Sequence, residues 1–156
     1  MHALIGIHAF LGEAGALAFL WVLVELLSPS ESRVRRATRI AGIGVLFLFL
    51  AWIVGGYYYL TEYQSIVKPV IKAGPLPWTH SVITETKEHV FLFLPFLALG
   101  AWSILKRHGS EMMQNRRTAA AAIIVSALIV LMAFSIAGMG FMISSGFRSA
   151  LESKAL

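Results

Sequence analysis

The chain has 156 residues, of which 58% are hydrophobic and only 13% are charged. This composition excludes an ordinary soluble domain, and the lack of cysteine excludes disulfide frameworks, iron–sulfur ligation and covalently attached c-type haem. The net charge of +5 comes from basic residues in short stretches between apolar runs. Such stretches are a topology signal rather than a nucleic-acid surface, so no nucleic-acid partner is expected.

Four apolar runs follow one another along the chain, each long enough to cross a hydrocarbon core of about 30 Å. The runs are continuous and do not alternate with polar residues, so helices are predicted rather than the strands of a closed barrel. We therefore expect an all-α fold, an integral membrane antiparallel four-helix bundle that forms one domain over residues 1–156. The predicted spans are residues 3–27, 40–60, 84–105 and 118–144.

Basic residues in the short connections predict the orientation. The 1–2 connection holds four arginines, and the 3–4 connection holds Lys106, Arg107, Arg116 and Arg117. The 2–3 connection and the C-terminal tail are poorer in basic residues. The positive-inside rule then places the 1–2 and 3–4 connections on the cytoplasmic side of the cell membrane, with both termini and the 2–3 connection outside.

Two further predictions concern the longest connection and an acidic residue of the first span. The 2–3 connection, residues 61–83, is the one larger outer loop, and its Lys68-Pro69 and Gly-Pro-Leu-Pro sequences predict an ordered but non-helical segment. Glu25 lies near the cytoplasmic end of the first span, so we expect it to reach the interface or to pair with an arginine of the 1–2 connection.

Two histidines are the main candidates for chemistry. His8 lies near the start of the first span and His89 near the start of the third. Similar apolar lengths separate each histidine from the inner charged flank, so both are expected at the same depth in the outer half. The first and third helices are diagonal partners in a simple up-down bundle. Diagonal imidazoles at equal depth suit a planar haem whose iron takes one axial ligand from each side.

Neighbouring residues extend this interpretation. Gly12 and Gly15 share a helical face with His8 and would leave room for a porphyrin edge, although small residues also pack membrane helices without a cofactor. Glu85, one turn before His89, is expected to be a hydrogen-bond acceptor that holds His89 in one tautomer, or a neighbour of the propionates. His80 is expected at the interface, with metal ligation as the less favoured reading.

Other interpretations stay open. Glu85 and His89 are spaced to share one ion, and His8, His80 and Glu13 could complete a copper or zinc site. Glu13 is otherwise expected to be a neutral carboxyl group hydrogen-bonded within the bundle. A third interpretation is a cofactor-free anchor or assembly subunit that contacts partner subunits or further copies of the chain.

Stand-alone catalysis has little support in the sequence. There is no aspartate, so no Ser-His-Asp set exists, and no nucleotide-binding motif occurs. An electron carrier or subunit is favoured over an enzyme.

With its four spans and with His8, Gly12, Gly15 and His89, the chain resembles a small four-helix membrane b-type cytochrome. The resemblance implies one haem b per chain, ligated by His8 and His89, that exchanges electrons with a quinol, a periplasmic carrier or a partner subunit. Cytochromes of the b561 type and respiratory cytochrome b subunits carry two stacked haems, one near each membrane face. The inner half of this chain has no second histidine pair, so it is not expected to relay electrons across the membrane alone.

Overall fold

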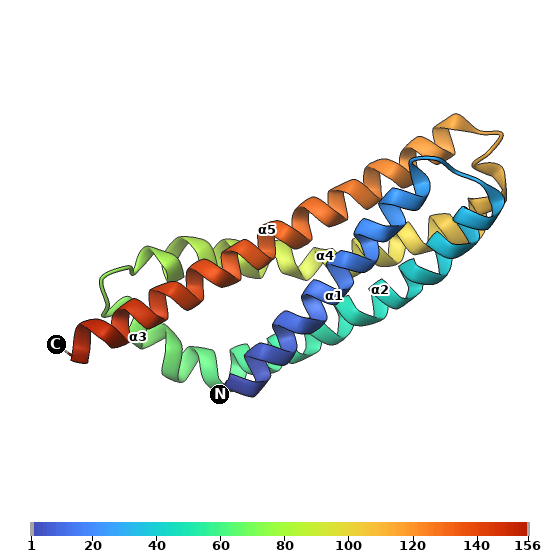
Figure 1. Ribbon diagram of the computed structural model, residues 1–156. Helices are drawn as coiled ribbons and strands as arrows, with labels where there is room; N and C mark the ends of the chain where they lie inside the picture. The colour runs from blue at the N-terminus through green and yellow to red at the C-terminus, as the bar shows by residue number, and fades with distance from the viewer. Residues whose placement is uncertain (1, 156) are drawn as a thin grey trace.

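The computed structural model describes residues 2–155 and is all-helical, with no strand among these residues, which confirms the all-α part of the predicted fold class (Figure 1). Four helical stretches are long and apolar enough to cross a membrane. The elements are α1 (His2–Leu26), α2 (Glu31–Tyr58), the π-helix η1 (Tyr59–Val67), α3 (Lys68–Lys72), the π-helix η2 (Thr79–Thr84), α4 (Glu85–His108), the 3-10 helix η3 (Gly109–Glu111) and α5 (Arg116–Ala155).

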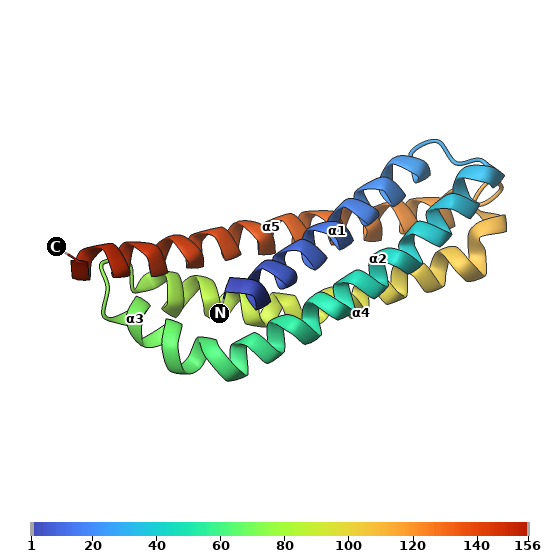
Figure 2. The same cartoon turned by 60° about the horizontal axis from the view of Figure 1, so that its bottom comes forward.

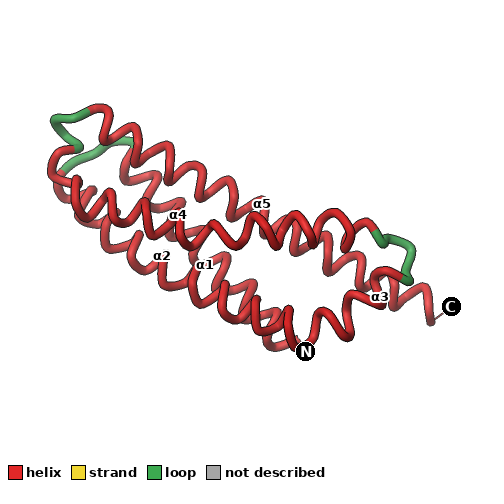
Figure 3. The backbone as a smooth tube through the Cα atoms, turned by 180° about the vertical axis from the view of Figure 1, so that it is seen from behind, coloured by secondary structure: helices red, strands yellow, loops and turns green. Residues whose placement is uncertain are grey.

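The two ends of the bundle differ in structure. The α1–α2 and α4–α5 connections lie together at one end, which we call the loop end (Figures 1 and 3). The other end, which we call the cap end, holds the start of α1, the end of α5, and η1, α3 and η2 between them.

The helices pack as the up-down topology predicts. Helix α1 packs against α2 and α5, and α4 packs against the same two helices, so α1 and α4 are diagonal (Figure 2). The core of this bundle is closely packed: Phe19, Leu48, Leu94 and Ile129 are almost fully buried, and several alanines are buried with them. In a membrane, where lipid tails are as apolar as these side chains, dense packing of this kind is what holds helices together.

The predicted non-helical loop at residues 61–83 is wrong. The structure places η1, α3 and η2 there and leaves only residues 73–77 outside helices. Pro69 lies in the first turn of α3, a position at which proline does not prevent a helix. The chain changes direction through this segment (Figure 1), and π-helical turns are a known cause of such bends.

At the loop end, Glu25 joins α1 to α2. Its carboxylate accepts hydrogen bonds from Arg33 Nε at 2.8 Å and from Arg36 Nε at 3.0 Å. The side chain of Ser30 caps α2 by accepting a bond from the Arg33 backbone N–H at 3.4 Å. The expected pairing of Glu25 with arginine of the first connection is therefore confirmed.

Candidate functional site

Between the packed core and the cap lies a layer in which none of the four long helices buries a residue. Added Cβ atoms at Gly12, Gly56 or Gly138, which belong to this layer, would meet no atom within 4 Å. Tight packing resumes only on either side, at Ala51 toward the loop end and at Tyr63 toward the cap end. We call this layer without buried residues the open layer. It comprises residues 3–14, 52–62, 85–93 and 137–145.

His8 belongs to the open layer and is half-buried there. Its Nδ1 lies 2.9 Å from the backbone oxygen of Ala51 on α2. A carbonyl oxygen can only accept, so Nδ1 carries the hydrogen and Nε2 is left as the free ring nitrogen. Gly55 makes the contact feasible, since a Cβ there would lie 2.6 Å from Nδ1. The ring also meets Phe91 of α4 edge to face, with centroids 5.4 Å apart.

Lys87 faces the same layer from α4. It lies one turn before Phe91, within electrostatic range of the His8 ring, and a Cβ on Gly140 of α5 would lie 3.2 Å from its Nζ. Within the described residues, no carboxylate forms an ion pair with Lys87. An ammonium group inside an apolar helix bundle is costly without an anionic partner, which makes Lys87 a candidate to bind an anionic group.

His89 faces the other way. Its side chain is exposed, and its Nδ1 donates to the backbone oxygen of Glu85 at 2.6 Å. His89 precedes Phe91 by two residues, which is about 200° around an α-helix, and Phe91 is the residue that meets His8. The structure therefore does not bring His8 and His89 together, and a haem held between these two rings does not fit this arrangement.

The remaining predicted residues fall in separate places. Gly12 lies in the open layer, whereas Gly15 is in the core, where a Cβ would lie 2.8 Å from the Leu48 side chain. The carbonyl group of Glu85, and not its carboxylate as expected, binds His89. Glu13 is exposed rather than hydrogen-bonded inside the bundle.

The alternative of a site with several histidine and carboxylate ligands is not assembled. Among residues 2–155, no three side chains of histidine, aspartate or glutamate come together as a metal-binding group.

A buried polar network, missed by the sequence analysis, lies at the cap end. The hydroxyl group of Tyr63 in η1 is 3.0 Å from His80 Nδ1 and 2.8 Å from Thr84 Oγ1, both in η2. Thr84 donates its hydrogen to the Thr79 carbonyl at 3.0 Å, so it must accept from Tyr63. Tyr63 in turn must accept from Nδ1–H of His80. All four side chains are at least 96% buried.

The donor and acceptor roles along this chain of hydrogen bonds place the ring hydrogen of His80 on Nδ1. With Nδ1–H committed to Tyr63, His80 presents Nε2 to the Glu85 carboxylate, 3.6 Å away. A proton on Nε2 would complete an ion pair between His80 and the Glu85 carboxylate. Glu88 lies next to the Tyr59 hydroxyl, and no group among residues 2–155 forms a hydrogen bond to its buried Oε1. The cap end thus offers groups able to take up or release a proton.

No protein-family model, curated protein or solved structure matches this chain. The interpretation of the site therefore depends on its own geometry. In the part of the chain that the structure describes, the ring nitrogen Nε2 of His8 makes no hydrogen bond and the Lys87 ammonium group pairs with no carboxylate, and both groups belong to one loosely packed layer.

Proposed function

We propose that the chain is a membrane-embedded electron-transfer protein that binds one b-type haem in the open layer, with His8 as an axial ligand. The observation that carries this proposal is the half-buried ring of His8, which is held in one tautomer and lies within electrostatic range of Lys87. Histidines that ligate metals usually donate their other ring N–H to a backbone carbonyl or carboxylate, which orients the ring and leaves one nitrogen free. The Ala51 carbonyl has this role for His8.

The residues around His8 support haem binding in two further ways. The layer is rich in glycine and buries no residue, so its side chains can separate around a large planar ligand at little packing cost. Lys87 supplies a cation inside the bundle for a ligand that carries carboxylates. When bound, the haem iron would supply one-electron oxidation and reduction.

In this proposal the α4 residue that contacts the haem is Lys87, and not His89 as the sequence predicted. Lys87 would act either as an ammonium group paired with a propionate or as a neutral amine on the iron. His89 is left on the outward face of α4, where its exposed ring suits contact with lipid headgroups or a partner protein.

We place the cap end outside the cell membrane, because the loop end carries the denser basic residues. A quinol releases protons when it gives up electrons, and at that end the buried ring of His80 presents Nε2 to the exposed carboxylate of Glu85. In this proposal the pair accepts a proton from a quinol; a soluble carrier that delivers only electrons would not need it.

The test is the visible spectrum of the full chain purified in detergent from cells supplied with haem precursor. Reduced-minus-oxidised spectra with sharp α and β bands, and equimolar haem by pyridine haemochrome, are expected. Folded protein that stays colourless and takes up no added haem would overturn the proposal. That outcome would leave the cofactor-free anchor as the surviving interpretation.

A further inference from the structure

A groove of about 410 Å³ opens at the loop end between the start of α2 and the end of α4. Its wall carries three basic side chains from two helices, and its floor is formed by Val34, Leu105 and Gly109, which are buried. The lining is Glu31, Val34, Arg35, Thr38, Arg39, Leu105, Lys106, Gly109 and Ser110.

The charges in this groove are not balanced. Glu31 is its one acidic residue, and it already pairs with Arg35. In the described part of the chain, neither Arg39 nor Lys106 has a carboxylate partner. Lys106 lies over the Trp102 ring, with Nζ 5.1 Å from the ring centroid, which holds the ammonium group beside an indole. Two cations from different helices are therefore free to bind one anion.

An apolar stripe continues from the groove toward the middle of the bundle. Ile43 and Leu46 follow Arg39 at helical spacing, Leu99 precedes Lys106 by two turns, and all three side chains are exposed. A ligand that fits both features has an anionic head and long apolar chains. We infer that this groove binds the phosphate group of an anionic phospholipid, whose acyl chains lie along the stripe. Basic pockets between helices at a membrane surface bind such headgroups.

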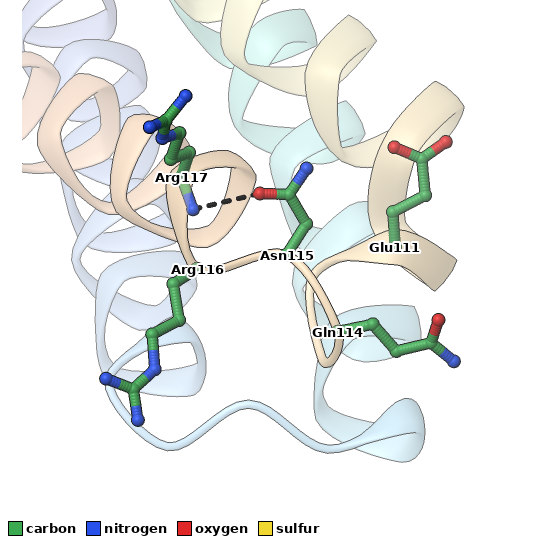
Figure 4. A pocket seen from close by; sticks show the side chains of 5 residues that line it. All are labelled: Glu111, Gln114, Asn115, Arg116 and Arg117. Carbon is green, nitrogen blue, oxygen red and sulfur yellow. Dashed lines mark hydrogen bonds between the residues drawn. The ribbon is translucent and has the colours of Figure 1, made fainter.

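A second cavity at the loop end does not have these properties. It measures about 600 Å³ and is lined by Glu111, Gln114, Asn115, Arg116 and Arg117. In Figure 4 the two arginine side chains point away from each other, while Asn115 is directed inward and accepts a bond from the Arg117 backbone N–H at 3.0 Å. These arginines therefore provide a matched control: they carry the same charge at the same end without converging.

The experiment is native mass spectrometry of the full chain in detergent, titrated with dioleoylphosphatidylglycerol or dioleoylphosphatidylcholine. We compare the natural chain with Arg39→Gln/Lys106→Gln and with Arg116→Gln/Arg117→Gln. Each cation near a membrane surface contributes roughly fivefold in affinity, so the groove double variant is expected to bind phosphatidylglycerol about 30-fold more weakly. The control variant should bind within about twofold of the natural chain.

Equal weakening in the two double variants, or no preference for phosphatidylglycerol over phosphatidylcholine, would overturn the inference. A separate arm titrates inorganic phosphate and follows its ³¹P line width. Phosphate that binds as tightly as the lipid would assign the groove to a free anion and overturn the lipid assignment. If the groove double variant does not fold, Lys106→Gln alone should weaken lipid binding by roughly fivefold. The inference depends on the membrane location of the chain but not on haem, so a colourless protein would leave this test unaffected.

Discussion

The rings of His8 and Phe91 meet edge to face across the diagonal of the bundle, with centroids 5.4 Å apart and planes at 81°. This contact fixes which side of α4 faces the interior near the cap end. It brings Lys87, one turn before Phe91, into the open layer and turns His89 outward. The rotation of α4 about its own axis therefore decides which of its residues can contact a ligand bound next to His8.

A side chain at Gly55 should disturb the contact that orients His8. A Cβ there would lie 2.6 Å from His8 Nδ1, so Gly55→Ala must displace the ring and break its bond to Ala51. We expect a loss of about 1–3 kcal/mol in the free energy of unfolding, as for other overpacked sites. Thermal unfolding followed by circular dichroism measures it. Gly56→Ala is the control: a Cβ there meets nothing, so helix propensity alone should stabilise the protein by about 0.5–1 kcal/mol. Equal effects at both positions would contradict the proposed geometry.

Removing the positive charge of Lys87 should stabilise the protein without its ligand. Lys87→Met replaces an interior ammonium group, which has no carboxylate partner among the described residues, by an apolar side chain of similar length, and we expect a gain of about 1–2 kcal/mol. The same substitution should lower haem content. Lys72→Met, at an exposed position, should change neither quantity. A destabilised Lys87→Met protein would show that Lys87 has a stabilising partner.

The cap network should depend on the Tyr63 hydroxyl group. Tyr63→Phe leaves His80 Nδ1–H without its acceptor in a buried site, and we expect a cost of about 1–3 kcal/mol. Hydrogen exchange of the amides in residues 59–67 should accelerate in this variant. Tyr57→Phe removes an exposed hydroxyl group and should leave exchange unchanged. Unaltered exchange in Tyr63→Phe would argue against the hydrogen-bond chain.

At the loop end, Glu25 should stabilise the junction between α1 and α2 more than Glu31 does. Glu25 bonds to two arginines and is 6% exposed, whereas the Glu31–Arg35 pair lies on the surface. We expect Glu25→Gln to lower the unfolding temperature and Glu31→Gln to leave it almost unchanged. Added salt should reduce the difference between the two variants. If Glu31→Gln lowers the unfolding temperature as much as Glu25→Gln does, the Glu25 carboxylate does not stabilise the fold more than that of Glu31.

Hydropathy was sufficient to predict the four helices, because lipid leaves few alternatives for a long apolar run. The pairing of Glu25 with arginine was also predictable, because Glu25 lies near the end of the first span and the arginines lie in the connection that follows it. The direction of His89 could not be predicted, because it depends on the register at which α4 begins. That register is set by η2, a π-helix with a different number of residues per turn, in a segment where the sequence predicted a loop.

The Tyr63–His80 network was missed for the same reason. The two residues are 17 positions apart, and both lie in π-helical segments that have no simple sequence pattern. The available signal was compositional: histidine and glutamate are concentrated in residues 62–89. The signal located a polar region but could not show that Glu85 faces His80 rather than His89.

The most direct test of the proposed function compares the haem content of His8→Ala with that of His89→Ala, measured by pyridine haemochrome on equal amounts of folded protein. Loss of haem in His8→Ala with haem retained in His89→Ala is the predicted result, since His8 is half-buried beside Lys87 whereas the His89 ring is exposed on the outward face of α4. Loss in both variants would show that α4 turns to bring His89 inward, and retention in both would contradict ligation by His8.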